Sequence, residues 1–305
     1  MFDTAIAAVI PVYNAGATLE RCLSCLSSQV PAPHEIVLID DASTDGGPAA
    51  LSPLDGLRIL RTDRRRGAAH ARNLGLKATT APLLLFLDAD VYLQPGALAA
   101  MLEAISGHDL CHPQLRFEDG SPFSLNDRYP TIWKGAASNL PSCSACFLMR
   151  REAFARLDGP FDETFLIYYE DTEFFLRCHL AGLRSRPVPE ALALHAAKPR
   201  HWTPQRFRLE VRHNLYVQLK HFPSSVQRSS CSVLGPAMPI WFCRWARSGA
   251  VQPRPSNVEL ARLLAEAFFW NLLRLPFTLR ANLRYRSYCR HLASRASTRA
   301  GATAR

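Results

Sequence analysis

The sequence lacks an apolar run long enough to cross a membrane. Its most hydrophobic stretch, residues 258–275, is interrupted by four charged side chains, whereas a spanning helix needs about 18 or more apolar residues with few charges. Acidic residues are also missing from the C-terminal end, because no Asp or Glu follows Glu266 while eight arginines do. We therefore expect no transmembrane helix and a strongly basic C-terminal region.

Cysteine is present, but not in a pattern typical of secreted proteins. The nine cysteines are an odd number, and nothing like a signal peptide precedes the first apolar run at residues 5–10. A reducing, cytoplasmic setting is therefore expected. Two Cys-x-x-Cys pairs begin at Cys22 and Cys143 and raise zinc binding as an alternative. However, 117 residues separate the pairs, whereas compact zinc sites leave about 12–20.

The positive charge is concentrated at one end of the chain. The formal net charge is +10, but residues 1–200 carry −4 and residues 201–305 carry +14. Such a basic block suits an anionic membrane surface or nucleic acid. Aromatic residues lie among the arginines, namely Phe268, Phe269, Trp270 and Phe277. One expectation is a helix held peripherally at the inner face of the cell membrane, and the other is packing of these aromatics on the rest of the protein.

The first 110 residues alternate short apolar runs with amphipathic helical patterns. Strands are expected at residues 5–12, 35–39, 57–60 and 83–87, and helices after Thr18, as the N-cap, and at 67–77. Apolar strands that alternate with amphipathic helices predict an α/β fold, in which helices cover both faces of a mostly parallel, Rossmann-like sheet.

Polar side chains follow three of these strands. They are Tyr13 and Asn14 after the first strand, Asp40 and Asp41 after the second, and Asp88 and Asp90 after the fourth. Because ligands of parallel sheets bind at the carboxyl ends of the strands, we expect these side chains to meet at one edge. Paired carboxylates suit Mg²⁺ or Mn²⁺, which can bridge a diphosphate and stabilise its charge as it leaves.

The rest of the chain is less regular. Residues 147–154 are mainly apolar, residues 168–183 are expected to form a helix that Gly182 closes, and a short apolar stretch ends at His195. A basic helix, a linker and a disordered tail are expected in turn at residues 205–220, 224–239 and 286–305.

Four short motifs occur in a fixed order in the first part of the chain. They are AVIPVYN at residues 8–14, VLIDDASTD at 37–45, AHARNLG at 69–75 and LFLDAD at 85–90. Together they resemble the nucleotide-binding half of family 2 glycosyltransferases, which have the GT-A fold. The resemblance continues at GPFDE (159–163), YEDTEF (169–174), Arg177 and His195, and it covers roughly residues 4–200.

This resemblance implies a domain organisation. Residues 1–110 would form the nucleotide-sugar-binding half of a GT-A domain, and residues 111–222 its acceptor-binding and catalytic half. Residues 223–305 would add a basic, helical C-terminal extension. The similarity is to members that assemble bacterial surface polysaccharides, rhamnosyltransferases among them.

The resemblance also implies which residues bind the donor. Pro11, Tyr13 and Asn14 match positions around the nucleotide base, and Asp41 matches the acid that accepts a hydrogen bond from the base, while Asp40 and Asp45 support the turn. A carboxylate suits that role because, when ionised, it accepts hydrogen bonds and donates none. Arg72 matches a position that approaches the phosphates, with a surface helix arginine as the alternative.

The resemblance also implies which residues bind the metal and which residue is the catalytic base. Asp88 would contact the ribose or the metal, whereas Asp90 and His195 would ligate Mn²⁺ or Mg²⁺. Asp171 is the expected general base and Glu170 its neighbour, which would raise the pKa of Asp171 if both point inward. The alternative is an ordinary acidic helix start.

Two positions depart from the family pattern. Glu173 stands where Asp is common, and Ser144 stands where glycine is expected. The second change predicts an altered acceptor subsite.

The predicted activity is metal-dependent, inverting transfer of a hexosyl or deoxyhexosyl group. The donor is a nucleotide-diphosphate sugar, and the acceptor is a saccharide or a lipid-linked hydroxyl in surface polysaccharide or glycolipid synthesis. Nucleotidyl transfer is a rival, but it generally uses a Gly-rich phosphate loop, which residues 13–16 do not form. Nucleic-acid binding is another rival, yet no binding motif accompanies the basic end, and a non-catalytic nucleotide-binding protein is the third.

Overall fold

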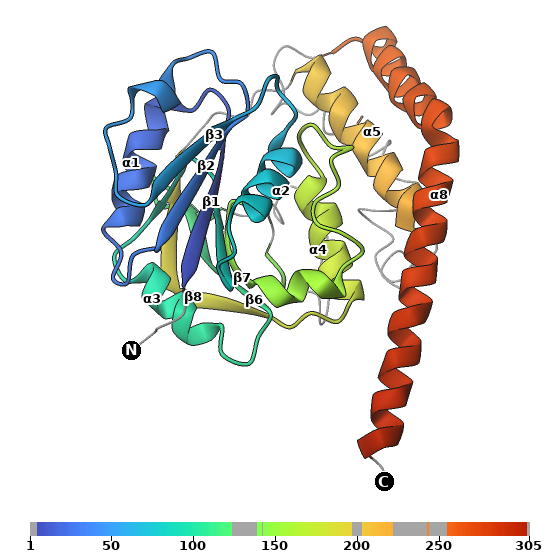
Figure 1. Cartoon of the computed structure of the whole chain (residues 1–305). Helices are drawn as coiled ribbons and strands as arrows, with labels where there is room; N and C mark the ends of the chain where they lie inside the picture. Colours follow the sequence, from blue (N-terminus) through green and yellow to red (C-terminus); the bar gives the residue numbers. More distant parts are fainter. Residues whose placement is uncertain are drawn as a thin grey trace. The chain divides into compact units, whose positions relative to one another are not determined.

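The computed structural model describes residues 5–123, 139–141, 143–196, 203–221, 243 and 255–303. The chain divides into two compact units (Figure 1). The first consists of residues 1–128 and 135–198, and the second of residues 129–134 and 199–305. All of the predicted donor, metal and catalytic residues fall in the first unit.

The first unit is built on a sheet whose first half matches the expectation. Its four strands are β1 (Ile6–Val12), β2 (Glu35–Asp40), β3 (Leu57–Arg61) and β4 (Leu83–Leu87). They lie in the order β3-β2-β1-β4 and pair in parallel, with Val9 opposite Val37 and Ala8 opposite Leu85. The apolar runs of β1, β2 and β4 are buried, as expected of central strands covered on both faces.

The second half of the sheet is mixed rather than parallel. Its strands are β5 (Val91–Leu93), β6 (Leu110–Phe117), β7 (Cys146–Arg150) and β8 (Ser185–His195). β7 is antiparallel to both β4 and β6, β6 is parallel to β8, and β5 is antiparallel to β8. Consequently Val91 pairs with His195, which places the end of β8 beside the residues that follow β4.

Helices cover both faces of the sheet, as predicted (Figure 1). They are α1 (Gly16–Ser27), α2 (Ala68–Ala78), α3 (Ala97–Ala104) and α4 (Glu170–Leu180), with 3₁₀ turns at Gly47–Ala50 and Arg151–Arg156. Leu19 of α1 and Leu98 of α3 join one apolar core, whereas Ala71 of α2 packs with Val37 and Ile39 on the other face.

Two details of these helices bear on the site. Gly75 lets α2 lie close to β1, because a methyl group at this position would come within 2.3 Å of Val9 Cγ1. The prediction that Thr18 caps α1 was wrong: the helix begins at Gly16, and Thr18 lies in its first turn. The cap comes instead from outside the helix, since Gly16 N donates to Asp45 Oδ2 at 2.8 Å. The helix predicted at 168–183 is α4, and Gly182 follows it with φ of 66°.

The second unit contains α5 (Pro204–His221) and α8 (Asn257–Thr303). The two helices pack together, with Asn271 Nδ2 donating to Arg212 O at 3.0 Å and Asn282 Nδ2 to Lys220 O at 2.8 Å. The linker expected at 224–239 lies outside the described residues. α8 continues to Thr303 where disorder was expected, and its Ala, Leu and Arg residues are good helix formers. Within the described part of the chain, no helix is long and apolar enough to span a membrane.

Candidate active site

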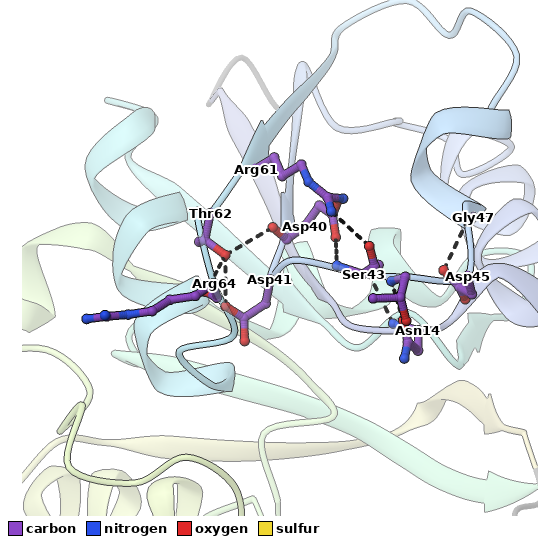
Figure 2. Close-up of polar contacts among 10 residues, drawn as sticks. Asn14, Asp40, Asp41, Ser43, Asp45, Gly47, Arg61, Thr62 and Arg64 are labelled. Carbon is purple, nitrogen blue, oxygen red and sulfur yellow. Dashed lines mark hydrogen bonds and ion pairs between the residues drawn. The ribbon is translucent and has the colours of Figure 1, made fainter.

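The turns that follow β1 and β2 are joined at the carboxyl edge of the sheet (Figure 2). Asn14 N donates to Ser43 Oγ at 3.1 Å, and Thr44 N donates to Asn14 Oδ1 at 2.8 Å. Asn14 adopts a left-handed backbone conformation with φ of 50°, which Asn tolerates better than most residues. Two of the three clusters that the sequence predicts at this edge are therefore joined by hydrogen bonds.

Asp40 and Asp45 hold the turn after β2 in place (Figure 2). Asp40 Oδ1 accepts from Ser43 N at 2.8 Å, and its other oxygen pairs with Arg61. Asp45 accepts from the backbone N–H groups of Gly16 and Gly47, and these donors lower its pKa. Both acids therefore support the turn, as the family resemblance implied.

Asp41 is buried and engaged by protein donors. Its Oδ1 accepts from Thr62 Oγ1 at 3.1 Å and from Arg66 N at 2.8 Å, and its Oδ2 accepts from Gly67 N at 2.7 Å. A carboxylate has about four acceptor positions, so most of its capacity is used. Asp41 thus fixes the loop that leads into α2, and its contact with a nucleotide base stays a prediction.

Tyr13 is the exposed aromatic side chain at this edge. It is 38% exposed, and the Arg65 guanidinium carbon lies 4.0 Å from its ring centroid, which is a cation–π geometry. Pro11 is half-buried within β1, opposite Ile39. Sequence reasoning missed Arg65, although the run of three arginines before Gly67 was a visible signal.

Arg72 is a buried connection between the donor-side acids and α4. It is only 2% exposed, so the surface-arginine alternative was wrong. Arg72 Nη2 donates to Asp88 Oδ1 at 2.7 Å, and Nη1 donates to Glu170 Oε1 at 3.3 Å. Burial raises the pKa of Asp88, and Arg72 opposes that shift. Three residues that are far apart in the sequence therefore form one charge network.

Asp90 and His195 face each other beside this network. His195 Nε2 lies 3.7 Å from Asp90 Oδ1, and Ala196 N donates to Asp90 O at 2.8 Å. The other ring nitrogen, Nδ1, lies 2.9 Å from Ala196 O and can donate to it. Such a backbone bond leaves Nε2 as an acceptor, which is the usual arrangement of a metal-ligating histidine.

These residues suit a divalent cation without forming a closed cage. One carboxylate oxygen and one imidazole nitrogen are acceptable Mn²⁺ ligands, and Asp88 adds a carboxylate that Arg72 holds. Within the described ranges, no three His, Cys, Asp or Glu side chains are gathered as a metal cluster. A zinc site would need such a group, so the zinc alternative gains no support from the described residues.

Glu170 and Asp171 begin α4, directly after two tyrosines with left-handed backbone conformations. Tyr168 and Tyr169 have φ of 66° and 71°, a strained geometry that is typical of functional sites. Glu170 is 10% exposed at its side chain, and burial followed by the charge of Asp171 raises its pKa to about 7. The charge of Asp171 thus acts on Glu170, whereas the expected effect of Glu170 on Asp171 stays a prediction. Asp171 Oδ1 accepts from Thr172 N at 2.6 Å.

Other family positions tie residues 159–161 to both α2 and α4. Glu173 is fully buried and pairs with Arg177, whose guanidinium also donates to Gly159 O at 2.7 Å. Asn73 of α2 donates to Phe161 O at 2.8 Å. Ser144 is buried beside Ala145, whose carbonyl accepts from Asp88 N at 2.9 Å. The longer side chain of Glu173 is therefore accommodated by its ion pair.

Comparison with known proteins decides the family. The sequence profile described as glycosyl transferase family 2 matches residues 7–158. The N-acetylglucosaminyl-diphospho-decaprenol L-rhamnosyltransferase of Mycobacterium tuberculosis is 30% identical over 233 residues, which cover 61% of this chain and 76% of that protein. This chain belongs to glycosyltransferase family 2. The glycosyltransferase AglE of Haloferax volcanii is 26% identical over 206 residues, covering 64% of this chain and 67% of that protein.

Solved structures agree with the fold of this family 2 glycosyltransferase. The mannosyltransferase PcManGT of Pyrobaculum calidifontis, in complex with GDP-Man and Mn²⁺, aligns with a TM-score of 0.61 and 19% identity over 96% of this chain and 87% of its own. GalNAc-T7 with UDP, GalNAc and Mn²⁺ aligns with a TM-score of 0.58 and 19% identity over 90% and 57%. At these identities the likeness shows the fold, which is the expected GT-A fold.

Proposed function

We propose that this glycosyltransferase moves a hexosyl or deoxyhexosyl group from a nucleotide-diphosphate sugar to a hydroxyl of a saccharide or lipid-linked acceptor, with inversion. The observation that carries the proposal is the Arg72 network, which joins Asp88 on the donor side to Glu170 at the start of α4. A surface-polysaccharide or glycolipid pathway is supported by the names of the curated relatives.

In the proposed mechanism Asp171 is the general base. Its carboxylate takes the proton of the acceptor hydroxyl as the oxygen attacks the anomeric carbon of the donor. A new glycosidic C–O bond forms while the bond between the anomeric carbon and the diphosphate oxygen breaks, and the electron pair leaves with the nucleoside diphosphate. Thr172 N fixes the position of Asp171 Oδ1, and Arg72 holds the neighbouring Glu170 at its Oε1.

The residues that follow β4 and end β8 would suit a divalent cation. Asp90 and His195 would hold Mn²⁺ or Mg²⁺, with Asp88 next to them, because their oxygen and nitrogen donors suit these ions. When bound, the cation neutralises charge on the leaving diphosphate. The residues of the cation site would therefore assist the leaving group, whereas Asp171 would deprotonate the acceptor.

Thermal stabilisation by sugar nucleotides tests the proposal. We expect Mn²⁺ and a cognate sugar nucleotide together to raise the melting temperature of the full chain, because they bind only the native state. Asp90→Ala and His195→Ala should lose the Mn²⁺-dependent part of the shift and the transfer activity while remaining folded. Asp55→Ala, an exposed acid before β3 at the opposite edge of the sheet, is the control. Full activity of Asp90→Ala would contradict the site assignment.

We also propose that α8 contacts an anionic membrane surface peripherally. Phe268, Phe269, Leu273 and Phe277 are exposed on this helix, with Leu273 at 79%. Exposed arginines, including Arg274, Arg280 and Arg284, lie among them. Apolar side chains beside arginines suit the boundary between headgroups and acyl chains. Trp270 packs against Tyr216 of α5 instead, at 6.2 Å between ring centroids.

Sedimentation with vesicles tests this contact. We expect the full chain to sediment with phosphatidylserine-containing vesicles at low salt and less with neutral vesicles. The double variant Phe269→Ser/Leu273→Ser should bind them weakly, whereas Val30→Ser, an exposed apolar residue of the first unit, should behave as wild type. Equal sedimentation of wild type and the double variant would contradict the role of α8.

A further inference from the structure

A cavity of about 320 Å³ lies in the first unit beside β6 and β8. Pro113, Phe123 and Val188 are buried residues that line it, and the thiols of Cys143 and Cys146 line it as well. None of the donor-, metal- or base-binding residues assigned above is part of this lining. The cavity is therefore a separate feature of the molecule.

The cavity lies beside an irregularity in the pairing of two strands. Pro113 of β6 pairs with Val188, but the next residue, Gln114, pairs with Leu192, so residues 189–191 of β8 have no partner on β6. Pro113, Pro187 and Pro189 surround this irregularity, and proline has no N–H to donate to a ladder. The extra residues of β8 interrupt the ladder at this point, and the cavity lies beside the interruption.

The described part of the lining favours neither a charged ligand nor a sugar. Among the described residues around the cavity there is no carboxylate, guanidinium or ammonium group. Burial lowers the pKa of His112, and the hydrogen bonds of its ring nitrogens with the carbonyl oxygens of Asn139 and Pro113, 3.2 Å and 3.3 Å away, oppose that shift. Gln114 is the remaining polar side chain other than the thiols, and it is exposed at the rim. Most of the described lining side chains are apolar, so they would pack against a hydrocarbon, whereas sugar hydroxyls would find few side-chain partners there.

The cavity borders the candidate active site at two points. The Phe123 ring, which lines the cavity, stacks on the His195 ring with centroids 4.7 Å apart and planes 16° apart. Cys146, also in the lining, pairs with Leu87, the residue before Asp88. A ligand in the cavity is thus one aromatic ring away from the proposed cation site.

We propose that this cavity holds the hydrocarbon chain of a lipid-linked acceptor, next to its sugar-bearing end. The inference rests on the proposed function and narrows the acceptor to the lipid-linked class. Phe123 lies between the two environments, because it lines the cavity and stacks on His195 of the proposed cation site. The hydrocarbon chain of the acceptor would bind in the cavity, and its polar head would bind on the His195 side of Phe123.

Two glucosides that differ only in their alkyl group test this proposal. We expect n-octyl β-glucoside, below its micelle concentration, to bind the full chain at least about tenfold more tightly than methyl β-glucoside by titration calorimetry, since burial of each methylene adds affinity. Gln114→Trp should remove that preference by filling the cavity from its rim. Arg186→Trp is the control, because this residue is exposed on β8 but does not line the cavity.

The outcomes separate this inference from the proposed function. The inference is overturned if the wild type does not prefer the octyl glucoside. It is also overturned if wild type and Gln114→Trp show the same preference, because the octyl group then binds elsewhere, such as on α8. Mn²⁺-dependent stabilisation by a sugar nucleotide, measured on the same proteins, should be unchanged in Gln114→Trp, which shows that the variant is folded. If no sugar nucleotide binds the wild type, the proposed function fails, and the acceptor assignment fails with it.

Discussion

Arg72 and Asp88 form an ion pair of 2.7 Å in which the arginine is almost wholly buried and the carboxylate lies at the edge of the candidate site. The same guanidinium reaches Glu170 at 3.3 Å. One cation thus serves two acids from different parts of the sequence. The position of Asp88 and that of the α4 N-terminus are therefore coupled through a single side chain.

The first prediction concerns the stability that this arginine provides. Arg72→Met should lower the free energy of unfolding by about 3–5 kcal/mol, because it leaves the buried Glu170 and the partly buried Asp88 without their cationic partner. Urea unfolding measures the change. Adding Glu170→Gln should recover part of the loss. Arg58→Met, which removes a half-exposed pair with Glu35, should cost no more than about 1 kcal/mol; a similar cost for both arginines would contradict the prediction.

The second prediction is a pH dependence of stability. The pKa of Glu170 is about 7 in the native protein, against an ordinary value of 4.5. The native state therefore binds more protons between these values, so the stabilising contribution of Glu170 falls as pH rises from about 4.5 to about 7 and then stays constant. Urea unfolding at pH 5, 6, 7 and 8 should show wild type losing stability relative to Glu170→Gln over this range. A difference that does not vary with pH would rule the effect out.

The third prediction separates chemistry from donor binding. Asp171→Asn should reduce kcat by roughly 10²–10⁴-fold, the usual contribution of a general base. Stabilisation by the sugar nucleotide and Mn²⁺ should persist, since Asp171 is assigned to the acceptor. Asp158→Asn, at an exposed acid in the same unit, should retain full activity. Loss of donor binding in Asp171→Asn would place this residue on the donor side instead.

The fourth prediction compares two glycines with positive φ. A methyl group at Gly67 would lie 2.2 Å from Leu166 O, whereas one at Gly96 would meet nothing within 4 Å. Gly96→Ala should cost about 1–2 kcal/mol from backbone strain alone. Gly67→Ala should cost clearly more and also weaken sugar-nucleotide binding, because Gly67 N bonds to Asp41. If both variants lose the same stability in thermal unfolding, the predicted clash of the added methyl group with Leu166 O does not destabilise the protein.

The fifth prediction concerns the nucleotide base. If the base stacks on Tyr13, Tyr13→Ala should weaken sugar-nucleotide binding by roughly 5- to 150-fold, because one aromatic–base stack contributes about 1–3 kcal/mol. Tyr13→Phe keeps the ring and should bind normally. Calorimetric titration with the sugar nucleotide gives the affinities. Unchanged affinity in Tyr13→Ala would place the base elsewhere.

The sequence predicted the first half of the sheet well because its strands are buried on both faces. The strands β1 and β4 read as unbroken apolar runs and end at polar turns, so their limits were found to within a residue. By contrast, β6 and β8 were not predicted as full strands. Prolines such as Pro113 and Pro187 weaken the strand pattern, and the pairing of β6 with β8 is between segments about 75 residues apart.

The site was predictable only in part, for a similar reason. The acids at the strand ends could be placed because topology alone brings the ends of parallel strands together. The burial of Arg72 could not be predicted, because an arginine in a helix is usually exposed. The sequence does not show that Asp88 and Glu170 surround its guanidinium. The roles of Asp41 toward the base and of His195 toward a metal depend on ligands, so they stay predictions.

The close approach at Gly75 sets how far Arg72 can reach. Both residues lie on α2, and this helix rests directly on the Val9 side chain. Any larger residue at position 75 would lift the helix from the sheet and carry the guanidinium away from the carboxylate that follows β4. Because position 75 carries no methyl group, α2 lies close enough to the sheet for Arg72 to reach both Asp88 and Glu170.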